Sequence, residues 1–191
     1  MRLSLGSIFR FDTSFSNLLV FGCIIATIAS WARPLLGDTY SLHPFFLLMG
    51  EYADFAFQVV LFQFFHADIW HLLGNSLSLL IFGNVVERIM GTTRYAWFFI
   101  ASTLFVSLLI LLFSRAPTVG ISGFAMAVFA YLALELRAQR HPEFGGIAAM
   151  VAINIAIGFL PQISLIGHAA GAVFGVIAFF LPRLFRANAR R

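Results

Sequence analysis

Long apolar runs separated by short polar stretches dominate this chain of 191 residues. A transmembrane helix needs about 20 predominantly apolar residues, so the distances between charged residues locate the candidate helices. Pro161 and Gln162 divide the longest uncharged stretch, residues 144–182, because proline is typical of a helix boundary. The pattern therefore predicts six membrane-spanning helices, at residues 15–33, 69–88, 94–114, 121–137, 145–160 and 165–183.

The longest connection between these helices, residues 34–68, contains a further apolar stretch. Residues 55–67 are uncharged, but 13 residues are too few to cross a bilayer and are typical of an interfacial or re-entrant segment. No fixed-period repeat or long linker divides the chain. We therefore expect a single domain over residues 1–191, an all-α polytopic membrane protein with a six-helix bundle and an interfacial first loop.

The composition agrees with a protein that is solvated by lipid. Hydrophobic residues make up 61% of the chain and charged residues 10%, against roughly 45–50% and about 25% in soluble domains. The formal net charge of +4 is not gathered into a basic run, so it suits anionic lipid and argues against nucleic acid as a partner. The single cysteine, Cys23, cannot form an internal disulfide.

The arginines are divided unequally between the two ends of the predicted helices. One side has only Arg33 and Arg115, and the other has ten: Arg2, Arg10, Arg88, Arg94, Arg137, Arg140, Arg183, Arg186, Arg190 and Arg191. Because cytoplasmic segments collect positive charge, both termini are predicted to be cytoplasmic. Arg33-Pro34 argues against cleavage after the first helix, and the compact chain without a targeting presequence favours a bacterial inner membrane.

Polar residues at one shallow depth stand out within the predicted helices. The second, fourth and sixth helices all begin on the non-cytoplasmic side, and their first turns contain His71, Asn75, Ser122 and His168. Polar residues inside a membrane are costly, so such a cluster is a candidate functional site. The predicted site opens to the non-cytoplasmic side of the membrane.

His71 and Asn75 are four residues apart, so on a helix they lie one above the other on the same face. Two donors on one rigid face could hydrogen-bond the oxyanion that develops during acyl transfer. The alternative is that the two side chains bind neighbouring helices and serve only packing.

Gly120-Ile121-Ser122-Gly123 opens the fourth helix. A serine at a helix N-terminus could act as a nucleophile, and it could equally be an N-cap within a small-residue packing face. The small residues around it, Gly120 and Gly123, allow another backbone to approach closely. This is not the elbow motif of soluble hydrolases, because no strand is predicted before it.

Gly167-His168 begins a series of glycines on the sixth helix, which continues with Gly171 and Gly175. Such a stripe favours close contact between helices in lipid. If it packs on Gly123 and Ala127, His168 comes within reach of Ser122 and could activate it as a base. No acidic residue is predicted nearby to orient the imidazole, which indicates a Ser–His dyad without a third member.

Together these residues resemble the rhomboid family of intramembrane serine proteases over essentially the whole chain. The motifs that carry the resemblance are His66-x4-His71-x3-Asn75, Glu87-Arg88-Ile89-Met90-Gly91, Gly120-Ile121-Ser122-Gly123 and Gly167-His168-x2-Gly171. Each motif alone is weak, but their order and their places in the six predicted helices are specific.

The resemblance implies a rhomboid-type six-helix bundle that cleaves transmembrane or membrane-proximal segments of other proteins, without a cofactor. Ser122 would be the nucleophile and His168 the general base. His71, Asn75 and the Ser122 backbone N–H would form the oxyanion hole, and His66 would support the first loop or the catalytic water. The substrates implied are segments with a small residue where the helix unwinds easily.

The chain departs from the family pattern at two places. Many bacterial relatives have an aromatic residue four positions after the nucleophile, and here Met126 occupies that position. Methionine can also pack against an imidazole, so we expect a perturbed base and not a lost one. Phe57-Gln58 stand where relatives often have a Trp-Arg pair in the first loop.

Other classes of function fit the sequence less well. A non-catalytic rhomboid-like protein that binds client transmembrane helices is the alternative, although it has no chemical reason to retain Ser122 and His168. A small transporter would need matching broken helices in its two halves. No metal site is expected, because His66 and His71 point about 140° apart on a helix. The acids lie in loops or at helix ends, which excludes an aspartyl protease.

Overall fold

The computed structural model describes residues 14–114 and 116–188, with side chains as far as Leu181. Regular secondary structure in these ranges is helical, apart from one antiparallel bridge between Leu42 and Thr118. The helices are α1 (Phe15–Ala32), α2 (Pro34–Tyr40), α3 (Phe45–Leu48), α4 (Tyr52–Leu61), α5 (Ile69–Ser78), α6 (Asn84–Met90), α7 (Thr92–Phe113), α8 (Ser122–Ala138), α9 (Phe144–Ile157) and α10 (Leu165–Asn188). A 3-10 turn (η2, Phe62–Phe64) follows α4, and a π-helical segment (η3, Leu79–Gly83) joins α5 to α6.

The helices coincide closely with the six predicted ranges, and the break at Pro161-Gln162 separates α9 from α10 as expected. Three helices are long and apolar enough to cross a membrane, namely Phe15–Ala32, Ile69–Met90 and Thr92–Phe113. Phe144–Ile157 and Leu165–Leu181 are apolar but shorter. The apolar helices are those of a multi-pass membrane protein, while the number of six crossings stays a prediction.

The predicted orientation rests partly on residues that the structure does not describe. Arg2, Arg10, Arg115, Arg190 and Arg191 lie outside the described residues. The unequal division of arginines, and with it the cytoplasmic position of both termini, therefore stays a prediction from the sequence.

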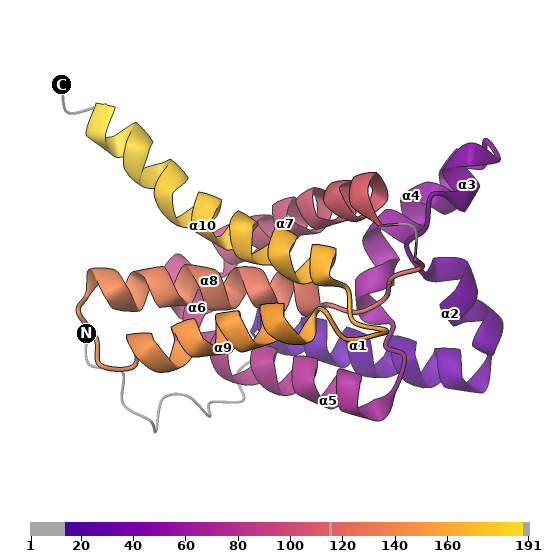
Figure 1. The fold of residues 1–191 in the computed structure, drawn as a ribbon, viewed down its shortest axis with the longest axis horizontal. Helices are drawn as coiled ribbons and strands as arrows, with labels where there is room; N and C mark the ends of the chain where they lie inside the picture. The colour runs from indigo at the N-terminus through magenta and orange to yellow at the C-terminus, as the bar shows by residue number, and fades with distance from the viewer. Residues whose placement is uncertain (1–13, 115, 189–191) are drawn as a thin grey trace.

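Helix α8 runs through the middle of the bundle (Figure 1) and is buried along almost its whole length. A helix that is apolar all round is typically buried on every face, and the many alanines of α8 allow its neighbours to approach closely. Because Ser122 is the first residue of this central helix, it is surrounded by the ends of other helices.

Helix α10 packs on α8 through glycines, as the stripe of small residues predicts. A Cβ atom at Gly171 would overlap the carbonyl oxygen of Gly123, and one at Gly175 would overlap the carbonyl oxygen of Ala127. Backbones this close are possible only where side chains are absent. The contact sets the first turn of α10 beside the first turn of α8.

Glu87, at the end of the second predicted span, anchors the start of α1. Its buried carboxylate accepts hydrogen bonds from the backbone N–H groups of Phe15 (3.0 Å) and Ser16 (2.9 Å) and from the Thr92 hydroxyl (2.8 Å). The first N–H groups of a helix have no partner within the helix, and a carboxylate there is also favoured by the helix dipole. Glu87 therefore has a structural role in joining α1 to the α6–α7 junction.

The first loop is folded and largely helical. Within residues 55–67 two buried glutamine side chains attach it to the bundle: Gln58 Nε2 donates to the Thr39 carbonyl (2.8 Å) and Gln63 Nε2 to the Thr103 hydroxyl (2.6 Å). Phe57 is exposed beside them. The interfacial position of this segment in the bilayer stays a prediction.

Candidate active site

The loop that precedes α8 is held at two points. The Gly120 N–H donates to the Phe62 carbonyl (3.0 Å), and the backbones of Leu42 and Thr118 exchange hydrogen bonds of 2.8 and 3.1 Å. Gly120 has a φ of +110°, a conformation that favours glycine. Because the loop is held in this way, Ser122 begins α8 at a defined position in a groove of about 920 Å³.

The predicted supporting residues Gly120 and Gly123 make room for neighbours of Ser122. A Cβ atom at Gly120 would lie 2.7 Å from Nε2 of His71, so the absence of a side chain lets the imidazole lie over this backbone. A Cβ atom at Gly123 would lie 2.8 Å from the Val106 side chain and 3.3 Å from the Gly167 carbonyl. Both glycines are therefore needed for packing around the groove.

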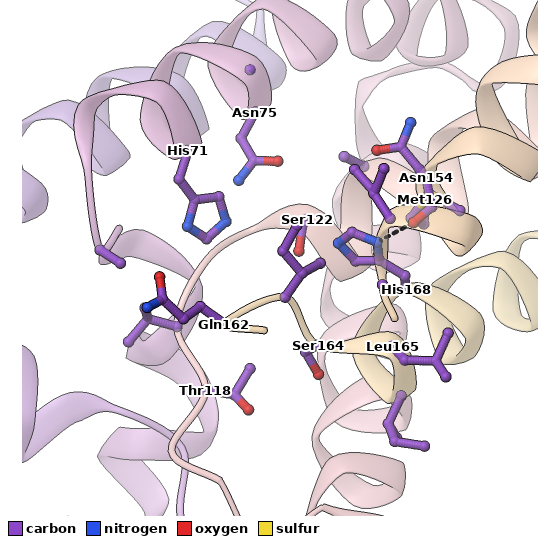
Figure 2. Close-up of a pocket in the computed structure, with 18 of the residues that line it drawn as sticks. His71, Asn75, Thr118, Ser122, Met126, Asn154, Gln162, Ser164, Leu165 and His168 are labelled. Carbon is purple, nitrogen blue, oxygen red and sulfur yellow. Dashed lines mark hydrogen bonds between the residues drawn. The ribbon is translucent and has the colours of Figure 1, made fainter. Parts of the chain in front are cut away.

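His168 lies in the first turn of α10 and is held at one of its ring nitrogens. Its Nδ1 is 2.7 Å from the backbone carbonyl oxygen of Asn154. Because a carbonyl can only accept, this bond requires the proton on Nδ1 and leaves a lone pair on Nε2. Figure 2 shows that the free nitrogen is turned toward Ser122. The imidazole is thus in the form that a general base needs.

No hydrogen bond joins Ser122 to His168 among the described residues, although the two side chains face one another (Figure 2). Hydrogen bonds between catalytic groups are often long or poorly aligned before substrate binds, and they shorten in the complex. The orientation of the imidazole, with its free nitrogen toward Ser122, is therefore the feature that indicates a general base.

The group that orients His168, the carbonyl of Asn154, was not found from the sequence. Helix α9 ends at Ile157, and the Gly158 N–H bonds to the carbonyls of Ile155 and Ala156. The last four carbonyls of a helix lack partners within it, so that of Asn154 is available to the imidazole. The sequence offered no acidic residue for this place, and because every residue has a carbonyl, no side-chain signal marked this one.

His71 and Asn75 come together on one face of α5, as predicted. The Asp68 side chain accepts a bond from the His71 N–H (2.9 Å) and caps the helix. Both side chains face the groove opposite Ser122 (Figure 2). The amide nitrogen of Asn75 is buried and has no hydrogen-bond partner among the described residues. Buried donors normally have partners, so this nitrogen is available to a molecule in the groove.

Three further residues line the groove near these groups (Figure 2): Met126, Gln162 and Ser164. Met126 is fully buried on the same side of the groove as His168, and its contact with the imidazole stays a prediction. Ser164 accepts a bond from the Gly167 N–H (3.0 Å) and so caps α10. Gln162 and Ser164 were not predicted as part of the site, because the sequence marks them only as polar residues of a short loop.

His66 lies just before α5, buried beside the ring of His71 with the ring centroids 4.9 Å apart. Its Nδ1 is 3.1 Å from the hydroxyl of Thr27, which also donates to the Phe64 carbonyl (3.2 Å). Since a hydroxyl has one proton, Nδ1 of His66 must be the donor to Thr27. His66 therefore links α1 to the start of α5, and its support of the first loop or the catalytic water stays a prediction.

Burial lowers the pKa of His66 to about 3, with a smaller contribution from His71. Above about pH 6.5 the residue is neutral whether the chain is folded or unfolded. Between pH 6.5 and 3 only the unfolded chain binds the proton, so the free energy of unfolding should fall by roughly 1.4 kcal/mol per pH unit through this residue. Thermal unfolding at pH 6.5 and 4.5 should therefore show a smaller loss of stability for His66→Gln than for the wild type; equal losses would contradict this.

The described residues hold no group of three or more His, Cys, Asp or Glu side chains that could bind a metal ion. The polar groups that line the groove include the Ser122 hydroxyl, the imidazoles of His71 and His168 and the amide of Asn75. A serine at a helix N-terminus, an imidazole with a free lone pair and an unpaired amide donor are the parts needed for nucleophilic acyl transfer.

The chain is similar in sequence to known proteins of one family. The family model of the Rhomboid domain matches residues 54–184, more than half of the chain. RHOMBOID-like protein 1 of Arabidopsis thaliana is 31% identical over 123 residues, which cover 61% of this chain and 32% of that protein.

Two bacterial proteins are also similar. Rhomboid protease GluP of Bacillus subtilis is 31% identical over 118 residues, 59% of this chain and 23% of that protein. Rhomboid protease GlpG of Haemophilus influenzae is 25% identical over 132 residues, 64% of this chain and 68% of that protein. The match thus spans about a third of the Arabidopsis protein and about a quarter of the Bacillus protein.

Proposed function

The chain belongs to the rhomboid family, and from this premise we propose that it is an intramembrane serine endopeptidase that acts through Ser122 and His168. The family and the apolar helices make it an integral, multi-pass membrane protein whose surroundings are the lipid bilayer. Its substrates would be transmembrane or membrane-proximal segments of other membrane proteins. The arginine distribution supports an orientation with cytoplasmic termini and a groove open to the other side.

In the proposed reaction, Nε2 of His168 takes the proton of the Ser122 hydroxyl as its oxygen attacks the substrate carbonyl carbon. The Asn154 carbonyl keeps the proton on Nδ1 and so keeps Nε2 available as the base. The protonated imidazole then donates to the departing amine, which leaves an acyl group on Ser122. Water, activated by His168 in the same way, hydrolyses this ester and restores the serine.

The single observation that carries this proposal is that the buried, unpaired amide of Asn75 lines the same groove as Ser122 and His168. A donor at that place is available to the oxyanion that exists only during the reaction. His71 on the same helix face and the free N–H at the start of α8 would complete the oxyanion hole.

Asn75→Ala tests the proposal. Loss of one oxyanion donor should lower the turnover number by on the order of 10²–10³. Stability to thermal unfolding should not fall in parallel, because the deleted amide has no partner in the folded protein. The measurements are cleavage of a fluorescence-quenched single-span peptide in liposomes and the midpoint of thermal unfolding.

Ser76→Ala is the matched control, because the Ser76 hydroxyl is also buried without a partner and is next in the chain. It should leave turnover unchanged. An Asn75→Ala protein that unfolds more easily but turns over normally would instead support the packing role and contradict the oxyanion hole.

A further inference from the structure

A second cavity, of about 490 Å³, adjoins the catalytic groove at the end of α1 where α2 begins. Ala67, Pro117 and Val119 line both the groove and this cavity, so the two lie side by side. A peptide chain that occupies the groove at Ser122 can therefore extend over these three residues into the second cavity.

The groove and the second cavity each contain a carboxylate. Asp68 lines the groove, Asp38 of α2 lines the second cavity, and both residues are exposed. Among the described residues that line them, these two are the only Asp, Glu, Lys or Arg side chains. Trp31 also lines the second cavity and is 45% exposed. Because the face of an aromatic ring attracts a cation, both places favour positive charge.

The fold does not require the charge of either carboxylate. Oδ1 of Asp68 accepts the His71 N–H (2.9 Å) and caps α5, but a neutral asparagine caps a helix equally well. The hydrogen bond that the Ser41 hydroxyl makes with Asp38 goes to the backbone carbonyl (2.9 Å) and not to the carboxylate. The second oxygen of Asp68 and the carboxylate of Asp38 are therefore available to a ligand.

The charge of the predicted non-cytoplasmic side agrees with a basic ligand. Its segments, residues 33–68, 114–121 and 158–164, contain four acids and two arginines. An acidic face raises the local concentration of a positively charged segment. Ordinary membrane proteins collect their lysines and arginines on the cytoplasmic side, so a preference for basic residues on the other side would distinguish among substrates.

We propose that Asp68 and Asp38 bind lysine or arginine side chains of the substrate on the non-cytoplasmic flank of the bond to be cleaved. The inference rests on the proposed protease function and deepens it by naming the substrate class, membrane segments with basic residues beside the cleaved bond. Asp68 binds a residue close to that bond, and Asp38 binds one farther along the chain, next to Trp31.

Three single-span peptides test the inference. They carry Lys, Gln or Glu at two positions within about six residues of the cleaved bond, a stretch of about 20 Å when extended. In liposomes of zwitterionic lipid, the wild-type kcat/KM should be about 5-fold higher for the Lys peptide than for the Gln peptide, and about 5-fold lower for the Glu peptide. These differences should shrink at about 0.5 M salt, because salt screens exposed charges.

Neutral variants assign the preference to the two carboxylates. Asp68→Asn and Asp38→Asn should each lower the ratio of kcat/KM between the Lys and Glu peptides, and the double variant should bring it close to one. Asp54→Asn is the matched control, because Asp54 is exposed on the same predicted side but lines neither the groove nor the second cavity. It removes the same charge and should keep the wild-type ratio. Labelling of Ser122 by a small, uncharged fluorophosphonate should be unchanged in all four variants.

The contrary outcomes are distinct. Equal cleavage of the three peptides by the wild type, or an unchanged ratio in the double variant, would overturn the inference. An equal loss of preference in Asp54→Asn would also overturn it, because the preference would then come from the net charge of this side. In these cases labelling of Ser122 and cleavage of the Gln peptide leave the protease function intact. If the wild type is neither labelled nor able to cleave any of the peptides, the protease function fails and this inference fails with it.

Discussion

Ser122→Ala should lower cleavage of a single-span substrate by about 10⁴-fold or more, because the substitution removes the atom that attacks the peptide carbonyl. The hydroxyl makes no hydrogen bond with the described residues, so the variant should fold and be inserted normally. Cleavage in liposomes, together with covalent labelling by a fluorophosphonate, measures the effect. Labelling should be lost with cleavage, since both need the same activated oxygen.

Ser78→Ala is the matched control, because Ser78 also lines the groove but its hydroxyl donates to the Gly74 carbonyl of its own helix (2.7 Å). It should cleave and be labelled like the wild type. Undiminished cleavage by Ser122→Ala would contradict the proposed nucleophile. A wild-type protein that binds client helices without any cleavage, equally well in both variants, would support the non-catalytic alternative.

Gly171→Ala should lower the free energy of unfolding by roughly 3 kcal/mol. The molecules that unfold as a result should be inactive. The added methyl group would overlap the backbone carbonyl of Gly123, which cannot turn aside as a flexible side chain would. The two helices must separate to admit it, and this displaces His168 from Ser122. Thermal unfolding and the labelling rate measure the two consequences.

The same substitution at Gly146 should have the opposite effect on the stability of the folded protein. Gly146 lies in α9, and a Cβ atom there would have no neighbour within 4 Å. Alanine is favoured over glycine in helices by about 1 kcal/mol, so Gly146→Ala should be neutral or stabilising. If Gly171→Ala proved as stable as Gly146→Ala, the close contact between α8 and α10 would be wrong.

Much of the helical structure follows from local features of the sequence. The distances between charged residues locate the helices to within a few residues, and Pro161 marks the break between α9 and α10. Apolar length and proline act over a few neighbouring residues, so they can be read without knowing the fold. The glycine stripe likewise predicted its partners, because close packing in lipid needs small residues on both helices.

The candidate site could be predicted in its side chains but not in its full chemistry. Ser122, His168, His71 and Asn75 were identifiable by type, spacing and depth, and the structure brings them to one groove. The sequence had left open whether Asn75 merely packs against a neighbour. That question depends on whether a partner lies within hydrogen-bond distance, which is a property of the folded chain.

By itself the sequence determined the lipid environment, the order of the helices and the residue types at the groove, because composition and periodicity are properties of the chain alone. Only the tertiary structure decided which nitrogen of His168 is free, since the group that holds the other one is a backbone carbonyl of Asn154. It also decided that Gln162 lies in the groove. Backbone groups are the same at every residue, so their roles appear only when the end of one helix is set against the side chain of another.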